Sequence, residues 1–347
     1  MKLALVLFNL GGPDSPSSVE PFLANLFSDP AILPFPKLLR IPLARFIARR
    51  RAPVAQDIYR RIGGRSPILK ETQAQARAFE AELDRRGVNA KVFIAMRAWK
   101  PFSAETAGEI KGWGPDRIIL LPLYPQFSAT TSGSSLEDWK TAAKTAGLDA
   151  AQSRICCYPD AAGFIAAQAA LIAEAFGRRQ PHVDYRLLLS AHGLPKRLIS
   201  RGDPYQWQVE KTARAIVDAL GVPALDWQLC YQSRVGPLEW IGPATDAEIR
   251  RAGAQGKGVI VSPIAFVSEH SETLVELDME YAKLAGESGV PHYLRVPTVG
   301  THPLFIAGLA DLVVQAIAHD VVTSSTGRIC PTSCRGCGYG VAQCSRG

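Results

Sequence analysis

Two stretches of the sequence repeat one pattern, a buried strand that runs into a glycine turn. Residues 5–13 read LVLFNLGGP, and residues 187–195 read LLLSAHGLP. A second pair also matches, because residues 118–122 and 259–263 are both apolar runs that end in proline and lead into a loop rich in hydroxyl side chains. A chain of 347 residues is long enough for two ordinary domains. The repeat therefore predicts two similar domains rather than one irregular unit.

Apolar strand-like runs alternate with helical stretches along the chain. The predicted strands are residues 3–8, 91–95, 117–123, 154–158, 185–190, 259–264 and 292–296, and the predicted helices include 71–86, 104–111, 163–177, 206–220 and 303–318. This alternation is typical of parallel sheets that are covered by helices on both faces. The sequence therefore predicts an α/β fold of two Rossmann-like, doubly wound domains with an active-site cleft between them.

The two halves differ in length between matching prolines. Pro13 and Pro122 are 109 residues apart, whereas Pro195 and Pro263 are 68 apart, so the first half carries 109 − 68 = 41 extra residues. We assign these extra residues to a basic, apolar lip at about residues 20–60. The predicted domains are residues 1–150 with this lip, residues 151–325, and a cysteine-rich tail at residues 326–347.

The net charge of +7 is concentrated in the lip, where residues 37–51 contain six basic side chains and no acid. Such a segment can lie on an anionic membrane surface or hold an anionic ligand, although an ordinary surface helix shows the same pattern. Nucleic acid is not an expected partner, because the rest of the chain has mixed charge and no nucleic-acid motif. With no bilayer-length apolar run and no signal-peptide pattern, we expect a cytoplasmic protein.

Candidate catalytic residues follow two predicted strands of the second half. His192 ends one strand, and Glu272, Glu276 and Glu280 recur every four residues after the other, with His270 beside the first. The carboxyl ends of parallel strands meet at one edge of a sheet, where ligands bind. His192 with Glu272 could bind a divalent metal or accept protons, and the outer glutamates could extend a path for cations or protons. The alternative is a buried histidine beside a solvated helix face.

The cysteines are concentrated near one end of the sequence. Cys330, Cys334, Cys337 and Cys344 lie in the last 18 residues with the spacing C-x3-C-x2-C-x6-C. Disulfides are rare in cytoplasmic proteins, and four thiolates at this density suit an iron–sulfur cluster or a structural zinc. An unstructured cysteine tail is the alternative.

Several motifs, spread over nearly the whole chain, resemble those of the ferrochelatase family. They are NLGGP at 9–13, YRRIGG at 59–64 with SPI at 66–68, YPQ at 124–126, SAHGLP at 190–195, QSRVGP at 232–237 and the stretch 266–281. The resemblance implies two Rossmann-like domains and insertion of Fe²⁺ into protoporphyrin IX, the terminal step of haem synthesis. Protoporphyrin IX and Fe²⁺ are then the substrates.

The resemblance also implies roles for single residues. It makes His192 and Glu272 the catalytic, metal-binding pair and His270, Glu276 and Glu280 a proton or metal path. The positions that match porphyrin contacts are Leu10, Arg51, Tyr59 and Ser66. The lip matches a membrane-facing mouth of the porphyrin pocket, so peripheral contact with an anionic membrane is expected, while a homodimer stays an open alternative.

Some members of this family hold a [2Fe-2S] cluster through three cysteines near the C-terminus and one from the body of the chain. Cys334, Cys337 and Cys344 match the three, although the last gap is longer here. Ala129 stands where the body cysteine is expected, so the fourth ligand is open between Cys330, which we favour, and Cys156 or Cys157.

Three other functions fit parts of this pattern. A cobalt or sirohydrochlorin chelatase of the same fold would act on a more polar tetrapyrrole and would not need the apolar lip. A ferrochelatase specific for coproporphyrin is closer, although the ETLVELD helix at 272–278 resembles the protoporphyrin type more. From another class, a haem- or porphyrin-binding module would bind porphyrin without turnover.

Overall fold

The computed structural model describes residues 1–234, 236–325 and 327–339. Contacts divide the chain into two compact units. Unit 1 comprises Met1–Cys157, Ala310–Arg328 and the described residues from Gly338 on, and unit 2 comprises Tyr158–Leu309 and Ile329–Cys337. Residues 310–325, predicted to belong to the second domain, have their contacts in unit 1. The reason is that a late strand, β9 (Val321–Thr323), pairs with β4 (Ala151–Cys157).

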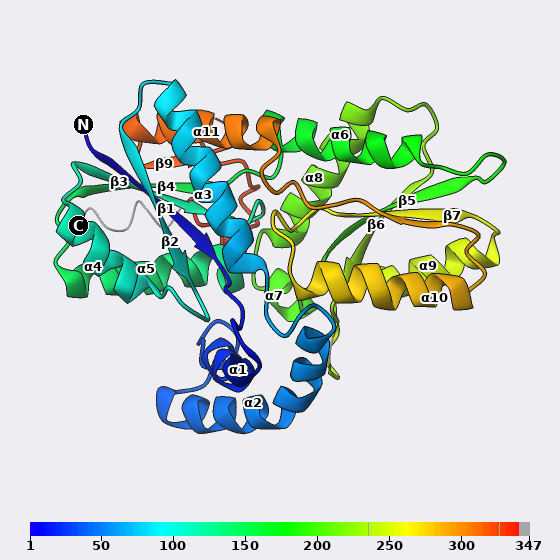
Figure 1. Ribbon diagram of the computed structural model, residues 1–347, viewed down its shortest axis with the longest axis horizontal. Coiled ribbons are helices and arrows are strands. Elements are labelled where there is room, and N and C mark those ends of the chain that lie inside the picture. The colour runs from blue at the N-terminus through cyan, green and yellow to red at the C-terminus, as the bar shows by residue number, and fades with distance from the viewer. Residues whose placement is uncertain (235, 326, 340–347) are drawn as a thin grey trace. The chain divides into compact units, whose positions relative to one another are not determined.

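Unit 1 is built on a parallel sheet with the strand order β2-β1-β3-β4-β9 (Figure 1). Its other strands are β1 (Leu3–Asn9), β2 (Ala90–Met96) and β3 (Arg117–Pro122). Its helices are α1 (Val19–Phe27), α2 (Lys37–Arg60), α3 (Ile68–Arg85), α4 (Ser103–Trp113) and α5 (Ser134–Ala146), with a short 3₁₀ turn η1 (Pro16–Ser18) and a π-helical turn η2 (Ala129–Gly133).

Unit 2 is built on a parallel sheet with the strand order β6-β5-β7-β8. The strands are β5 (Tyr185–His192), β6 (Trp227–Gln232), β7 (Gly258–Pro263) and β8 (Tyr293–Arg295). The helices are α6 (Ala162–Gly177), α7 (Lys196–Ser200), α8 (Tyr205–Leu220), α9 (Thr245–Ala254), α10 (Tyr281–Glu287) and a π-helical segment η3 (Glu272–Glu280). Helix α11 (Pro303–Ala318) begins in unit 2 and ends in unit 1.

The two sheets share topology and register. If β5 to β8 are matched in chain order to β1 to β4, the strand orders of these four strands are identical. Phe8 pairs with Pro122 in unit 1, and Ser190 pairs with Pro263 in unit 2. The repeat in the sequence is thus a repeat of strand order and register. Two parallel α/β sheets of this kind confirm the predicted fold class.

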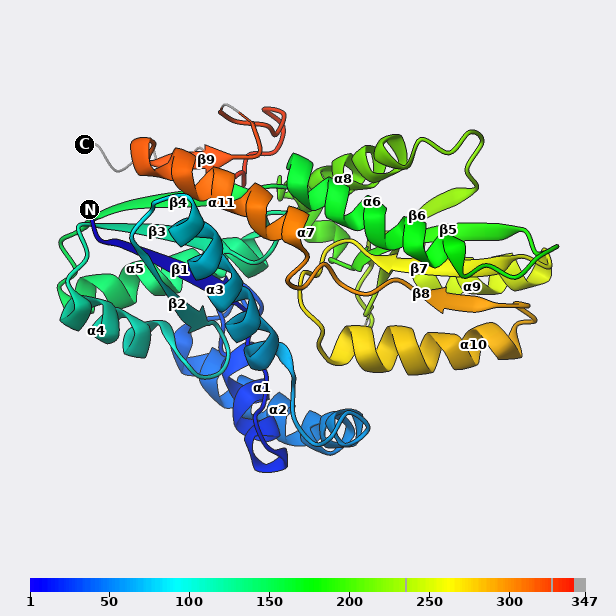
Figure 2. The same ribbon diagram turned by 45° about the horizontal axis from the view of Figure 1, so that its top comes forward.

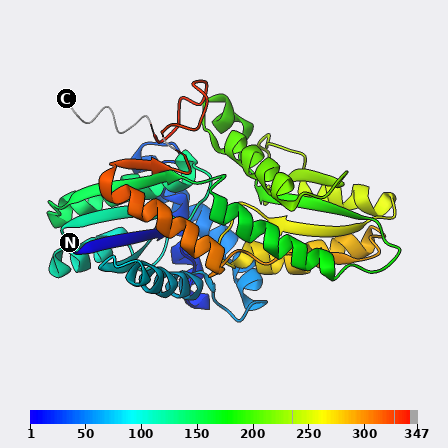
Figure 3. The ribbon, with the colours of Figure 1, turned by 90° about the horizontal axis from the view of Figure 1, so that it is seen from above.

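Helices cover each sheet, so the strands are buried on both faces. All seven side chains of β1 are buried, as is typical of a parallel strand between helix layers. In unit 1, α4 and α5 pack on one face, where Trp139 meets Phe8 edge-on, and α3 lies on the other face (Figure 2). In unit 2, α9 and α10 pack on one face, and α6 and α8 lie together on the other (Figure 3). The extra residues of the first half form α1 and α2, between β1 and β2.

Among the described residues, none of the helices combines the length and apolar character that a bilayer-spanning segment needs.

Candidate active site

His192 and Glu272 lie together in unit 2. His192 is the last residue of β5, and Glu272 is the first residue of η3, which follows β7. The Nδ1 of His192 lies 2.9 Å from Oε2 of Glu272. The two side chains are 35% and 29% exposed, so both can still reach a ligand. Because Glu272 is ionised, Nδ1–H donates to the carboxylate, which leaves Nε2 as the basic nitrogen of a neutral imidazole.

Ser233, directly after β6, joins the two glutamates of the site. Its Oγ lies 2.9 Å from Oε2 of Glu272 and also hydrogen-bonds Oε2 of Glu276. A hydroxyl has one proton, so Ser233 can donate to only one carboxylate at a time. Its φ of +61° lies in the left-handed region, where non-glycine residues are strained and often functional. Ser233 lies in the QSRVGP motif, and it joins the candidate site only through the fold.

Glu276 is held by several donors. The backbone N–H of Ser233 donates to Oε1 at 2.8 Å, and the hydroxyl of Tyr281 donates to the same oxygen at 2.9 Å. Nε2 of Gln232 donates to Oε2 at 3.2 Å, and Ser190 orients this amide by donating to its Oε1 at 2.9 Å. The position of Glu276 is therefore fixed by the ends of β5 and β6.

The segment that carries the glutamates is a π-helix rather than the α-helix that the spacing predicted. Its turns are one residue wider, so the N–H of Tyr281 donates to the C=O of Glu276, five residues back. Glu272 and Glu276 still converge on Ser233. Glu280, at the end of η3, is exposed. The structure thus brings two of the three predicted glutamates together.

Aromatic rings lie beside the two histidines. The ring of Phe266 is edge-on to His192, with centroids 6.3 Å apart, and contacts His270 at 4.5 Å. Nδ1 of His270 lies 3.1 Å from the C=O of Ser268, and since a carbonyl only accepts, Nδ1 carries the hydrogen. The ring of Phe266 therefore lies beside both histidines.

The charges of the site shift its pKa values in opposite directions. Burial lowers the pKa of His192, but the charge and hydrogen bond of Glu272 outweigh it and hold that pKa above 6.5. Burial would raise the pKa of Glu272, but the charge and hydrogen bond of His192 lower it to about 2. Burial and the charge of Glu272 raise the pKa of Glu276. Glu272 is therefore the anion of the site, and Glu276 is the carboxyl that holds a proton more readily.

The four predicted porphyrin contacts all lie in unit 1. Leu10 and Tyr59 belong to one apolar cluster of α1 and α2. The guanidinium of Arg51 lies 5.8 Å from the ring centroid of Phe27. The N–H of Ser66 donates to the C=O of Pro13 at 2.8 Å. The cleft expected between the domains stays a prediction.

The cysteine segment does not form the expected metal site within the described residues. Cys330, Cys334 and Cys337 are buried in consecutive turns, and Nε2 of Gln208 lies 3.0 Å from the sulfur of Cys330. Cys157 ends β4 in unit 1, and Cys344 lies outside the described residues. Across the described ranges, no three His, Cys, Asp or Glu side chains are grouped to hold a metal ion. Since Cys344 lies outside the described residues, the [2Fe-2S] cluster stays a prediction.

Comparisons with known proteins agree with this reading of the sequence. The family model described as Ferrochelatase matches residues 2–317. A ferrochelatase of Phenylobacterium zucineum is 54% identical over 350 residues, covering 100% of this chain and 99% of the relative. Those of Caulobacter vibrioides and Pelagibacter ubique are 54% and 49% identical, covering 95% and 91% of this chain and the same shares of the relatives.

Solved structures share the fold. SirB from Bacillus subtilis with Fe³⁺ has a TM-score of 0.53 at 15% identity, covering 92% of this chain and 96% of that one. The sirohydrochlorin chelatase SirB from Bacillus subtilis subspecies spizizenii with cobalt has a TM-score of 0.51 at 13% identity, covering 91% and 95%. At these identities the likeness shows the fold alone, and it is the predicted chelatase fold.

The pH titration of His192 tests the electrostatics of the pair. Replacing Glu272→Gln removes the charge that raises the pKa of His192, so this pKa should fall below its wild-type value. Because folding raises the pKa of His192, the protonated imidazole stabilises the folded state. This stabilisation is full below pH 6.5, the unfolded-state pKa, and is lost as the pH rises through the folded-state pKa of His192. NMR of ¹⁵N-labelled imidazoles measures the titration.

The control is Glu287→Gln, an exposed acid on α10. It should leave the His192 titration unchanged. If Glu272→Gln also leaves it unchanged, Glu272 is not the cause of the raised pKa.

Proposed function

The chain belongs to the ferrochelatase family, and we propose that His192 and Glu272 form the site at which it inserts ferrous iron into protoporphyrin IX. The enzyme is a metal chelatase of the terminal step of haem synthesis. The observation that carries the proposal is the 2.9 Å contact between a partly exposed histidine at the end of β5 and a carboxylate at the start of η3.

The reaction exchanges two pyrrole protons for one Fe²⁺, so the site needs a base. Nδ1 of His192 faces Glu272, and Nε2 is the nitrogen that can take a pyrrole proton. The anionic Glu272 stabilises the imidazolium that forms, because its charge raises the pKa of His192. One pyrrole N–H bond breaks as Nε2 gains its proton, and the electron pair left on that pyrrole nitrogen binds the iron. The second pyrrole proton follows the same route after Nε2 has released the first proton to water.

The His192–Glu272 pair suits transient binding of the substrate iron. Resident metals are usually held by three or four protein ligands. A metal that takes the place of the hydrogen between Nδ1 of His192 and Oε2 of Glu272 would have two protein ligands, both on partly exposed side chains. A site with so few ligands can hand the iron to the porphyrin.

We propose that protons or iron travel along His270, Glu276 and Glu280. The Ser233 hydroxyl links Glu272 to Glu276, whose raised pKa suits a proton acceptor. Glu280 is exposed at the end of η3 and would complete the path to solvent.

The ring itself needs an apolar surface and cationic anchors, because protoporphyrin IX is flat and carries two propionates. In unit 1, the partly exposed Leu10 supplies apolar surface in the cluster that contains the buried Tyr59, and Arg51 supplies a cation next to the ring of Phe27. Ser66 is the fourth contact that we propose.

Substitution of the central pair tests the proposal. His192→Ala and Glu272→Gln should each lower the rate of Fe²⁺ insertion by roughly 10²–10⁴-fold, the usual contribution of a general base. Anaerobic loss of porphyrin fluorescence measures insertion, and fluorescence quenching on titration measures porphyrin binding, which should persist.

His319→Ala, which alters an exposed histidine of unit 1, is the control and should keep wild-type insertion. Near-normal insertion by His192→Ala would remove the central role from this pair. A wild-type chain that binds porphyrin without turnover would instead be a binding module, and one that prefers sirohydrochlorin would be a sirohydrochlorin chelatase.

We propose that α2 contacts an anionic membrane surface. Leu38, Leu39 and Phe46 are 88%, 64% and 66% exposed, and Arg45 and Arg49 on the same helix are exposed as well. Exposed apolar groups with basic neighbours suit an interfacial helix.

The chain should co-sediment with anionic vesicles more than with neutral ones, and Leu38→Glu should reduce the fraction bound to anionic vesicles. Equal binding to anionic and neutral vesicles would contradict the proposal.

We also propose an iron–sulfur cluster on the cysteine tail, although the described thiols alone do not make a site for it. If Cys334, Cys337 and Cys344 hold a [2Fe-2S] cluster with Cys330 as fourth ligand, the purified chain should be coloured and contain about two irons. Cys330→Ser should lose the visible absorption, and Cys157→Ser should keep it. A colourless, zinc-loaded chain would contradict the cluster.

A further inference from the structure

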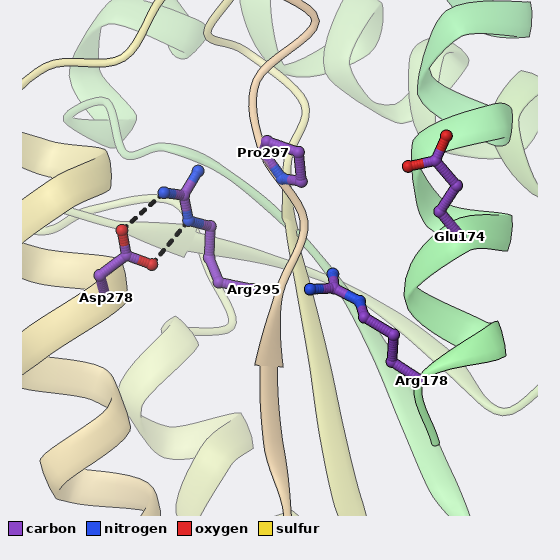
Figure 4. A pocket seen from close by; sticks show the side chains of 5 residues that line it. All are labelled: Glu174, Arg178, Asp278, Arg295 and Pro297. Atoms are coloured by element: carbon purple, nitrogen blue, oxygen red, sulfur yellow. Dashed lines mark hydrogen bonds and ion pairs between the residues drawn. The ribbon is translucent and has the colours of Figure 1, made fainter.

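Arg295, at the end of β8, contacts two acids that flank the site glutamates. Its Nε lies 2.7 Å from Oδ1 of Asp278 and its Nη2 lies 2.5 Å from Oδ2, a two-bond pair that Figure 4 shows. Its Nη1 lies 2.6 Å from Oε1 of Glu269. Glu269 precedes Glu272 by three residues, and Asp278 follows Glu276 by two. One guanidinium therefore spans the segment that carries both glutamates.

These contacts are shielded from water. The side chain of Arg295 is 13% exposed, and those of Glu269 and Asp278 are 20% and 34% exposed. Pairs of this kind are stronger than exposed pairs, and the planar guanidinium fork can bind two carboxylates at fixed angles. Burial would raise the pKa of Glu269, but the charge of Arg295 outweighs it and keeps this carboxyl ionised.

Two further hydrogen bonds hold the same side of the segment. The hydroxyl of Tyr293, also on β8, donates to the C=O of Leu277 at 2.7 Å. The N–H of Thr298 donates to Oε1 of Glu269 at 2.9 Å. On its other side, η3 presents Glu272 and Glu276 to Ser233. Since π-helical turns are rare and short in proteins, a nine-residue π-helix is a conformation that outside contacts have to support.

We propose that Arg295 is a positioning residue of the insertion reaction, holding η3 so that Glu272 and Glu276 keep their places. The inference rests on the proposed function of those glutamates. Arg295 acts through Glu269 and Asp278, and it stabilises the wide turns of η3 from the side opposite the reacting groups.

If Arg295 positions η3, its loss should slow the insertion of iron without weakening porphyrin binding. Displacing a reacting group by about 1 Å can cost about 10²-fold in rate. Arg295→Met should therefore lower kcat/KM for Fe²⁺ by about 10- to 100-fold, while the KM for protoporphyrin IX changes by less than about twofold, because the proposed porphyrin contacts lie in unit 1. Arg295→Lys keeps the charge but not the fork, and should recover part of the loss.

The matched control is Arg178→Gln. Arg178 lines the same pocket as Arg295, with Glu174, Asp278 and Pro297 (Figure 4). Within the described residues, its guanidinium makes no hydrogen bond or ion pair, and it lies on no part of η3. This variant should match wild type in both KM values and in kcat.

Asp278→Asn is the second test if Arg295→Met fails to fold, because it keeps the Arg295–Glu269 pair. It should show the same selective loss of kcat/KM for Fe²⁺.

Steady-state insertion assays of these variants decide the inference. Two results for Arg295→Met, or for Asp278→Asn if Arg295→Met does not fold, would show that Arg295 is not a positioning residue of the iron step. The first is a kcat/KM for Fe²⁺ equal to that of Arg178→Gln. The second is a KM for protoporphyrin IX that rises as much as the KM for iron. Glu272→Gln, assayed beside them, separates the two claims. An inactive Glu272→Gln with a normal Arg295→Met overturns only the role of Arg295, whereas an active Glu272→Gln overturns the proposed site itself.

Discussion

The hydrogen bond between His192 and Glu272 is the contact on which the proposed chemistry of this molecule depends. It joins the end of β5 to the start of η3, so it needs both strands in register and the loop after β7 in place. It also sets the protonation of the site, since each partner shifts the pKa of the other toward the charged pair. Ser233 and Glu276 extend this contact to the end of β6. Three successive strands of one sheet thus contribute to one polar group.

Because the two units share one topology, their residues at matching positions can be compared directly. Leu10, directly after β1, corresponds in the repeat to His192, the last residue of β5. The first four strands of unit 1 and the four strands of unit 2 have the same order. Unit 1 therefore has an apolar side chain at the position where unit 2 has a histidine. Both units also have a π-helical turn after the third strand, η2 and η3. The same scaffold thus carries different side chains in its two units, as the roles proposed for His192 and Leu10 require.

Much of this could be predicted from the sequence because the signals are local. Apolar strands, glycine turns and amphipathic helices are visible in short windows, and His192 and Glu272 are marked by their places at strand ends. β6 was missed because WQLCYQ mixes polar with apolar residues, and β9 because it has three residues. The four-residue spacing of Glu272, Glu276 and Glu280 does not distinguish an α-helix from a π-helix, so the sequence predicted the commoner α-helix. Ser233 and Arg295 were missed because their partners are 39 and 17 to 26 residues away, a distance that only the fold closes.

A crystal structure of the chain with a metal-free porphyrin bound tests the central claim most directly. The account predicts that Nε2 of His192 faces the pyrrole nitrogens, with Glu272 behind it still bonded to Nδ1, and that Leu10, Tyr59 and Arg51 contact the ring or its propionates. A porphyrin bound with its nitrogens turned away from His192 would contradict the account.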